Sequence, residues 1–218
     1  MTTPVVETNI SSSRLKSQQE FLLQGSILDN SVEDLLHRLR GLCDNADTSP
    51  EQFHDHEMIY SIRSPTTQVT SLRVRRCIEP ERKDMPWHLR YLGQPELGDK
   101  NRATLVRSCV DVAVSGNVVP FLQEMGFKLD YEFLSKGFMF KKGRMKVLVS
   151  KVSRVPDQSG PPQSEPLLIS HSYLVELSVV AASTGQEGLA DEVKAFAEQL
   201  KPLVYLEKID HRRLQLQM

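Results

Sequence analysis

The sequence is poor in several features that mark large classes of protein. Its three cysteines, Cys43, Cys77 and Cys109, are widely spaced among apolar residues, which indicates free buried thiols and no disulfide framework. No apolar run approaches the ~20 residues that cross a bilayer, and the first residues lack the apolar core of a secretory signal. Aromatic residues make up 6% of the chain and the formal net charge is −1, which argues against a base-stacking platform or a basic nucleic-acid coat. We therefore expect a globular protein of a reducing compartment, without direct contact to membrane or nucleic acid.

Motifs of catalysis and metal binding are also scarce. The chain has no glycine-rich phosphate loop and no zinc-type cysteine pair. Cys109 stands in an apolar run without a visible base. His54 and His56 share one face of a strand, but a metal site would need a third ligand, and no spacing links them to His88 or His171. A polar strand face explains the two histidines better, so we expect no catalytic, metal or cofactor site.

The chain divides into one long folded region and two polar segments. Residues 1–17 are rich in Ser and Thr and have no hydrophobic period, so we expect a disordered tail. Residues 18–218 are expected to form a single domain with a mobile loop at about 157–166, "DQSGPPQSEP". Within this domain, strand-like runs cover residues 19–28, 53–63, 69–79, 87–94, 102–116, 127–140, 144–154 and 167–181, and helical patterns cover 29–45, 117–126 and 189–200. Ser31 and Asn117 are expected to cap the first two helices.

The order of these elements predicts the fold class. A strand, a helix and three strands occur twice, and a last helix follows, although the two halves share no residue-level identity. Short turns join most neighbouring strands, which favours antiparallel pairing. Because eight long strands in an open sheet would leave costly edges, closure into a barrel is favoured. The sequence thus predicts an α+β protein, with one antiparallel multistranded β-barrel flanked by helices.

Several strand-like runs carry basic side chains on one face. Arg73 and Arg75 share a face, and Arg144 and Lys146 share another. In a barrel these side chains would face either the lumen or the solvent. A basic lumen would suit a polyphosphate, but an ordinary solvated sheet face is the interpretation that we favour.

The stretch "PWHLRYLG" combines the same basic pattern with aromatic residues. Trp87, Leu89 and Tyr91 alternate with His88 and Arg90, so the first three are expected to pack and the other two to face a polar lumen or a partner. Arg and aromatic residues are common anchors of protein interfaces. Trp87, Arg90 and Tyr91 are therefore the candidate partner-binding residues, although plain core packing explains Trp87 and Tyr91 equally well.

Three long blocks carry a family resemblance. They are "FLLQGSILDNSVEDLLHRLRGLCDN" (21–45), "PWHLRYLGQPELGDKNRATLVRSCVDVAVSGN" (86–117) with "FLQEMGFKLDYEF" (121–133), and "YLVELSVVA" (173–181) with "FAEQLKPLVYLEKID" (196–210). Together they resemble the family of subunit 18 of the Mediator complex, which bridges transcription regulators and RNA polymerase II, and they match an animal-type member particularly closely. The resemblance implies a helix-flanked barrel similar to the tunnel-shaped triphosphatases. It also implies a non-enzymatic structural subunit of the head module, located in the nucleus.

The resemblance further implies partners, but it transfers no interface residue. The expected partners are Mediator subunit 20, a related barrel that forms a heterodimer, the C-terminal helix of Mediator subunit 8, other head subunits and the RNA polymerase II machinery.

Tunnel triphosphatases hold a metal with Glu-x-Glu pairs on their strands, whereas Glu20 and Glu176 stand alone here. The competing hypothesis is a polyphosphate- or nucleotide-binding tunnel protein, with or without hydrolase activity, and these missing pairs argue against it.

Overall fold

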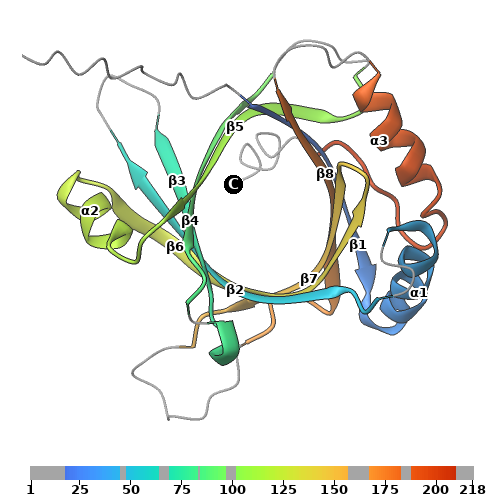
Figure 1. The fold of residues 1–218 in the computed structure, drawn as a ribbon, viewed down its shortest axis with the longest axis horizontal. Helices are drawn as coiled ribbons and strands as arrows, with labels where there is room; N and C mark the ends of the chain where they lie inside the picture. The colour runs from blue at the N-terminus through green and yellow to red at the C-terminus, as the bar shows by residue number, and fades with distance from the viewer. Residues whose placement is uncertain are drawn as a thin grey trace, which may run out of the picture.

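Eight strands close into one barrel, and three α-helices lie outside it (Figure 1). The structure is a computed structural model that describes residues 18–44, 48–63, 69–82, 84–96, 102–156, 167–182 and 188–209. The expected tail 1–17 and loop 157–166 lie outside these residues. The elements are β1 (Gln18–Leu28), α1 (Val32–Leu42), β2 (Glu51–Ile62), β3 (Thr70–Cys77), β4 (Trp87–Pro95), β5 (Leu105–Val114), α2 (Val118–Glu124), β6 (Lys128–Lys142), β7 (Met145–Arg154), β8 (Ser172–Ala182) and α3 (Leu189–Glu198), with short 3₁₀ turns at Asp29–Ser31 and Pro80–Arg82.

The barrel confirms the predicted fold class and the doubled order of elements. All described strand pairs are antiparallel, and the order around the barrel is β1-β5-β4-β3-β2-β6-β7-β8. The two halves exchange their first strands. β1 pairs with β8 of the second half, while β5 pairs with β4 of the first. No helix in the described ranges is long and apolar enough to span a bilayer.

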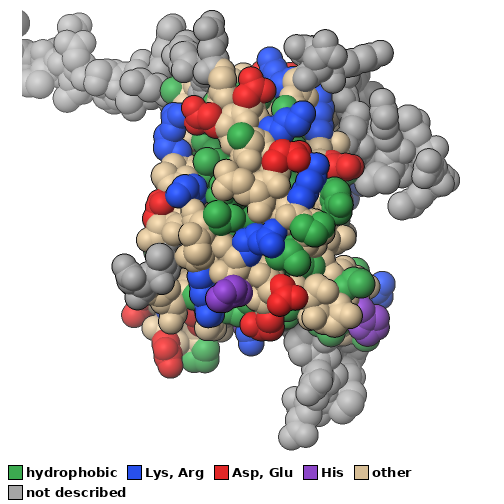
Figure 2. Space-filling model, turned by 90° about the vertical axis from the view of Figure 1, so that its right-hand side faces the viewer, with side chains coloured by type: hydrophobic (Ala, Val, Ile, Leu, Met, Phe, Trp, Pro, Cys, Tyr) green, Lys and Arg blue, Asp and Glu red, His purple; other side chains and the backbone are tan. Residues whose placement is uncertain are grey.

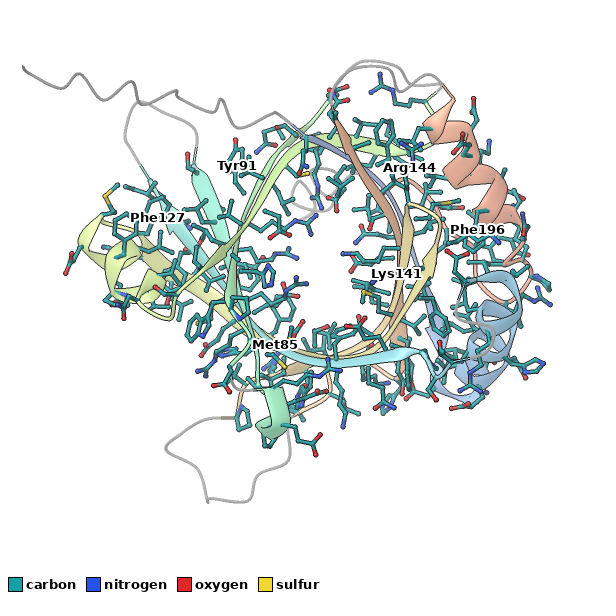
Figure 3. The ribbon with its side chains drawn as sticks, in the orientation of Figure 1. Met85, Tyr91, Phe127, Lys141, Arg144 and Phe196 are labelled. Carbon is teal, nitrogen blue, oxygen red and sulfur yellow. The ribbon has the colours of Figure 1, made fainter. Side chains whose placement is uncertain are left out.

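The main hydrophobic core lies outside the barrel, between its wall and the helices α1 and α3. Alternation along β1 directs Phe21 and Leu23 to this outer side, because successive side chains of a strand point to opposite faces. Leu39 of α1 and Phe196 of α3 are buried against them, and Figure 3 shows Phe196 between its helix and the barrel. The outer face of these two helices mixes acidic and basic side chains (Figure 2).

A second, smaller apolar cluster lies under α2. Val118 and Leu122 of this helix pack on Met58, Tyr60 and Val74 of the wall, with Trp87 and Leu89 partly buried beside them. The two outer clusters bury most of the large side chains, so that alternate positions on every strand are left to line the lumen. Burying each large aliphatic side chain contributes about 1.5–3 kcal/mol.

The helix starts differ from the prediction. Ser31 does not cap α1 with its side chain, and its Oγ instead donates to Oδ1 of Asn30 at 3.1 Å. The reason is local, since a 3₁₀ turn precedes the helix and Ser31 lacks the extended backbone of a capping residue. Asn117 makes no side-chain cap either, because its backbone is already helical. Gly126, after α2, and Gly143, in the turn between β6 and β7, have positive φ of +89° and +54°, which glycine adopts without strain.

After α3 the chain returns to the barrel wall. The backbones of Gln24 and Glu207 exchange two N–H···O bonds of 2.9 Å, so the C-terminal segment extends the wall beside β1. Gly25 permits this approach. A Cβ at that position would lie 2.3 Å from the carbonyl oxygen of Tyr205.

Candidate functional site

Polar and charged side chains line the lumen of the barrel. Two connected hollows of about 50 and 160 Å³ occupy it. Each strand contributes at least two side chains, at spacings of two or four residues: Glu20, Leu22, Asp55, Glu57, Arg73, Arg75, His88, Arg90, Arg107, Asp111, Ser135, Met139, Lys146, Leu148, Glu176 and Ser178. Figure 3 shows side chains entering the opening from all around the wall. Arg73, Arg75, Arg90 and Lys146 therefore line the lumen, and the favoured interpretation of a solvated sheet face was wrong for them. Arg144 lies outside β7, at an exposed turn, and does not share this face.

Glu20 stands at the centre of the strongest interaction in the lumen. Its carboxylate accepts from Nη2 of Arg90 at 2.6 Å and from Nε of Arg107 at 2.8 Å. Three neighbouring strands, β1, β5 and β4, supply these residues. Glu20 is 3% exposed. Burial raises the pKa of Glu20, but the two guanidinium groups outweigh burial and hold the pKa below its ordinary value.

Cross-strand ion pairs occupy most of the remaining lumen charges. Arg73 lies 3.2 Å from Glu57, and Arg75 lies 3.7 Å from Asp55. The second pair is the weaker one. Burial raises the pKa of Asp55 to about 6, because desolvation, with help from Glu57, exceeds the attraction of Arg75. Asp55 and Glu57 form an acidic pair two residues apart, but both face arginines.

Lys146 of β7 differs from the other lumen cations, since it has no hydrogen-bond or ion-pair partner among the described residues. Burial, reinforced by Arg90 and Arg75, lowers its pKa. The hollow of about 50 Å³ is lined by five Arg or Lys side chains and four carboxylates. Because this balance is near neutral, the lumen lacks the strong excess of positive charge that a polyphosphate site needs.

The described residues contain no group of three or more His, Cys, Asp or Glu side chains placed to hold a metal ion. His56 points to the outer face of β2. There its Nε2 lies 2.8 Å from Glu132, and Nε of Arg76 donates to its Nδ1 at 3.3 Å. The carboxylate only accepts, so the proton sits on Nε2. His88 lies in the lumen, 3.4 Å from Asp111, so the structure does not bring it to His56 on the outer face.

The three candidate partner-binding residues occupy different environments. Arg90 faces the lumen and is held by Glu20. Trp87 lies on the outer face, partly buried in the cluster under α2, with the guanidinium of Arg76 5.2 Å from its ring centroid. Tyr91 is also on the outer face and is 40% exposed. The structure thus divides the candidates between two sides of the wall.

Sequence reasoning identified the basic half of the lumen and missed the acidic half. Glu57 and Asp111 are as regularly spaced as the arginines, so the signal was present. The pattern that could have found it is the opposite charge on equivalent positions of neighbouring strands, such as Glu57 opposite Arg75 in the β2–β3 ladder. The three cysteines are free, as expected, although Cys77 is only partly buried.

A family profile and several related proteins match this sequence over nearly its whole length. The profile of the Med18 protein family matches residues 19–216. The protein named subunit 18 of the Mediator of RNA polymerase II transcription in Aedes aegypti is 55% identical over 217 residues, which cover 97% of this chain and 95% of the relative. Its namesake in Danio rerio is 56% identical and covers 91% and 92% of the two chains. The Caenorhabditis elegans protein of that name is 34% identical, with 88% and 84% covered.

Comparison with solved structures gives the same architecture at low sequence identity. A chain of the Schizosaccharomyces pombe Mediator head module superposes with a TM-score of 0.68, at 17% identity, over 88% of this chain and 98% of its own. A protein from Pyrococcus horikoshii superposes with a TM-score of 0.55, at 15% identity, over 91% and 98%. Similarities at these identities establish the barrel fold and carry no function with them.

Proposed function

Because the chain belongs to the Mediator subunit 18 family, we propose that it is a non-enzymatic structural subunit of the Mediator head module. The observation that carries this function is 54–57% identity to five animal relatives over 89% or more of this chain. Such a subunit acts in the nucleus, within a complex that links regulators to RNA polymerase II.

The proposed partners are Mediator subunit 20, the C-terminal helix of subunit 8, and through them the other head subunits. The likeness to the fission-yeast head module supports a place in such an assembly in general terms. A stable pair of this kind buries on the order of 1,200–2,000 Å².

The lumen chemistry supports a non-enzymatic role. A tunnel hydrolase needs carboxylates that are free to bind a metal and cations that are free to bind phosphate. Here Glu20 forms ion pairs with Arg90 and Arg107, and Glu57 forms one with Arg73. Ion pairs that hold neighbouring strands together suit a rigid scaffold better than a site that exchanges ligands.

Co-expression of the full chain with subunit 20 and the C-terminal segment of subunit 8 tests the assembly. We expect a single peak in size-exclusion chromatography with a light-scattering mass equal to the sum of the three chains. A chain that elutes alone, at about 25 kDa, at micromolar concentration and moderate salt, would refute the assembly role.

Among the candidate contacts, Tyr91 is the one whose ring could meet a partner without rearrangement of the barrel. We expect Tyr91→Ala to weaken partner binding while the midpoint of unfolding changes little. Trp87→Ala and Arg90→Ala are expected to lower the midpoint of unfolding, since the side chains of Trp87 and Arg90 are partly buried. Equal affinity of Tyr91→Ala and the unmodified chain for the partners would remove Tyr91 from the interface.

A further inference from the structure

One edge of the barrel wall is open in the part of the chain that the structure describes. The β2–β6 ladder extends to the pair Ser61–Lys128, but the β6–β7 ladder begins only at Phe133–Arg154. Residues 128–132 of β6 are therefore paired only with β2, and the register shifts at Asp130, which has no partner in that ladder. In Figure 1 this part of β6 runs from α2 toward the barrel wall. Backbone N–H and C=O groups along such an edge form a template for another strand.

The sequence explains why β7 leaves this edge uncovered. Val155 and Pro156 follow its last residue, and a continued register would place Pro156 opposite Tyr131. Proline has no N–H to donate to a ladder. The next ten residues, 157–166, contain three more prolines. A sequence so rich in proline is therefore poorly suited to pair with residues 128–132 of β6.

Apolar side chains lie on this open edge. Tyr131 is 58% exposed and stacks on Phe133, with ring centroids 6.4 Å apart. It lines a hollow of about 540 Å³ at the barrel mouth, together with Leu72 and Leu92. Leu129 is 45% exposed and lines a separate hollow of about 450 Å³. Tyr131 and Leu129 therefore expose apolar surface beside the open edge, which an incoming strand with apolar side chains could cover.

The charged side chains beside the open edge of β6 indicate which kind of segment could bind there. Asp130 lies 3.6 Å from Arg63, and Glu132 is held by His56 at 2.8 Å, so both carboxylates are already engaged. Lys128 and Arg154 have no ion pair within the described ranges, and they stand at the two ends of the open segment. The uncompensated charge is positive, which favours acidic groups on the incoming chain.

We propose that residues 128–132 bind an extended segment of another protein, which pairs with β6 and carries alternating apolar side chains with carboxylates near its ends. Five paired residues span about 17 Å at ~3.3 Å each, which requires a partner segment of similar length. A second copy of this chain fits poorly, because an antiparallel pair centred on Asp130 would place two aspartates opposite each other. This binding site goes beyond assembly into the head module.

Peptide selection on the full-length chain tests this surface. A phage-displayed library of random 12-residue peptides is selected against the immobilised protein, and the best peptide is synthesised. Hydrogen–deuterium exchange is then measured on the free and the peptide-bound chain. We expect selected peptides with alternating apolar residues and an excess of Asp and Glu, and slower amide exchange within residues 128–132 when the peptide is bound.

Charge reversal provides the matched control. Lys128→Glu and Arg154→Glu are expected to weaken the peptide roughly tenfold each. Arg144→Glu, at the exposed turn on the other end of the β6–β7 hairpin, should leave the affinity unchanged. Selection of no peptide, selection of basic or helix-periodic peptides, or protection mapped elsewhere would overturn the inference. Protection, in the free monomer or only in a dimer, of those amides of residues 128–132 that do not bond to β2 would overturn it as well, since the chain itself would then fill the edge.

Discussion

Glu20 and Arg90 are 70 positions apart in sequence and their strands are not neighbours, yet Nη2 of Arg90 lies 2.6 Å from Oε1 of Glu20. β5 separates the two strands and supplies Arg107 to the same carboxylate. One buried side chain thereby ties together three strands that come from both halves of the sequence. Removing it leaves Arg107 without an ion-pair partner among the described residues and leaves Arg90 with only Asp111, at 3.8 Å.

We predict that Glu20→Gln lowers the free energy of unfolding by about 3 kcal/mol, because the guanidinium groups of Arg90 and Arg107 stay in the lumen after the carboxylate that they bind is removed. Urea denaturation at pH 7 measures this loss. Glu33→Gln, at an exposed position of α1, is the control and should stay within about 0.5 kcal/mol of the unmodified chain. The pKa of Glu20 is lowered, so the difference should shrink as pH falls through that pKa, below 4.5. Equal losses in both variants would contradict this role.

Asp55 should give the opposite pH dependence. Its pKa is raised from 3.8 to about 6, so the folded state holds the proton more tightly than the unfolded chain does. Ionisation of Asp55 therefore reduces stability as pH rises from 3.8 through about 6. We expect Asp55→Asn to gain about 1–2 kcal/mol relative to the unmodified chain between pH 4 and pH 7.5, a value reduced for solvent in the lumen. A difference that is flat across this range would show that Asp55 has an ordinary pKa.

Two glycine substitutions should act in opposite directions. Gly25→Ala places a methyl group against the carbonyl of Tyr205, and we expect a loss of more than about 2 kcal/mol in thermal or urea unfolding. Gly41→Ala lies in α1 with nothing within 4 Å of the added atom, so it should stabilise the protein by about 0.5–1 kcal/mol. Hydrogen exchange should also accelerate at Glu207 in Gly25→Ala. Unchanged exchange there would mean that the C-terminal segment does not depend on this close approach.

The purified chain should not hydrolyse triphosphates. Incubation with ATP or a 5′-triphosphate RNA, with Mg²⁺ or Mn²⁺, is expected to release phosphate no faster than buffer, because the lumen carboxylates Glu20 and Glu57 are engaged by arginines. Turnover above about 1 s⁻¹ that disappears in Arg73→Ala and Arg75→Ala would identify the lumen as an active site.

The element order could be predicted because strand and helix periods differ and because turn residues such as Gly143 mark the connections. Ser31 was misassigned since a capping sequence does not reveal the 3₁₀ turn before it. The side of the wall that Arg73 and Arg75 face could not be predicted. A polar lumen and bulk solvent impose the same alternation, so only the closed barrel distinguishes them.

The exchange of first strands bears on the order in which a nascent chain can fold. β1 has its longest ladder with β8, and Gln24 and Glu176 in that ladder are 152 positions apart. A ribosome adding 5–20 residues per second would complete β8 about 8 to 30 s after β1. During that interval β1 has only its shorter ladder with β5, and its apolar outer side, with Phe21, Leu23 and Ile27, lacks α3, which follows β8. The barrel can therefore close only after nearly the whole chain has been synthesised, and the first strand must wait for the last.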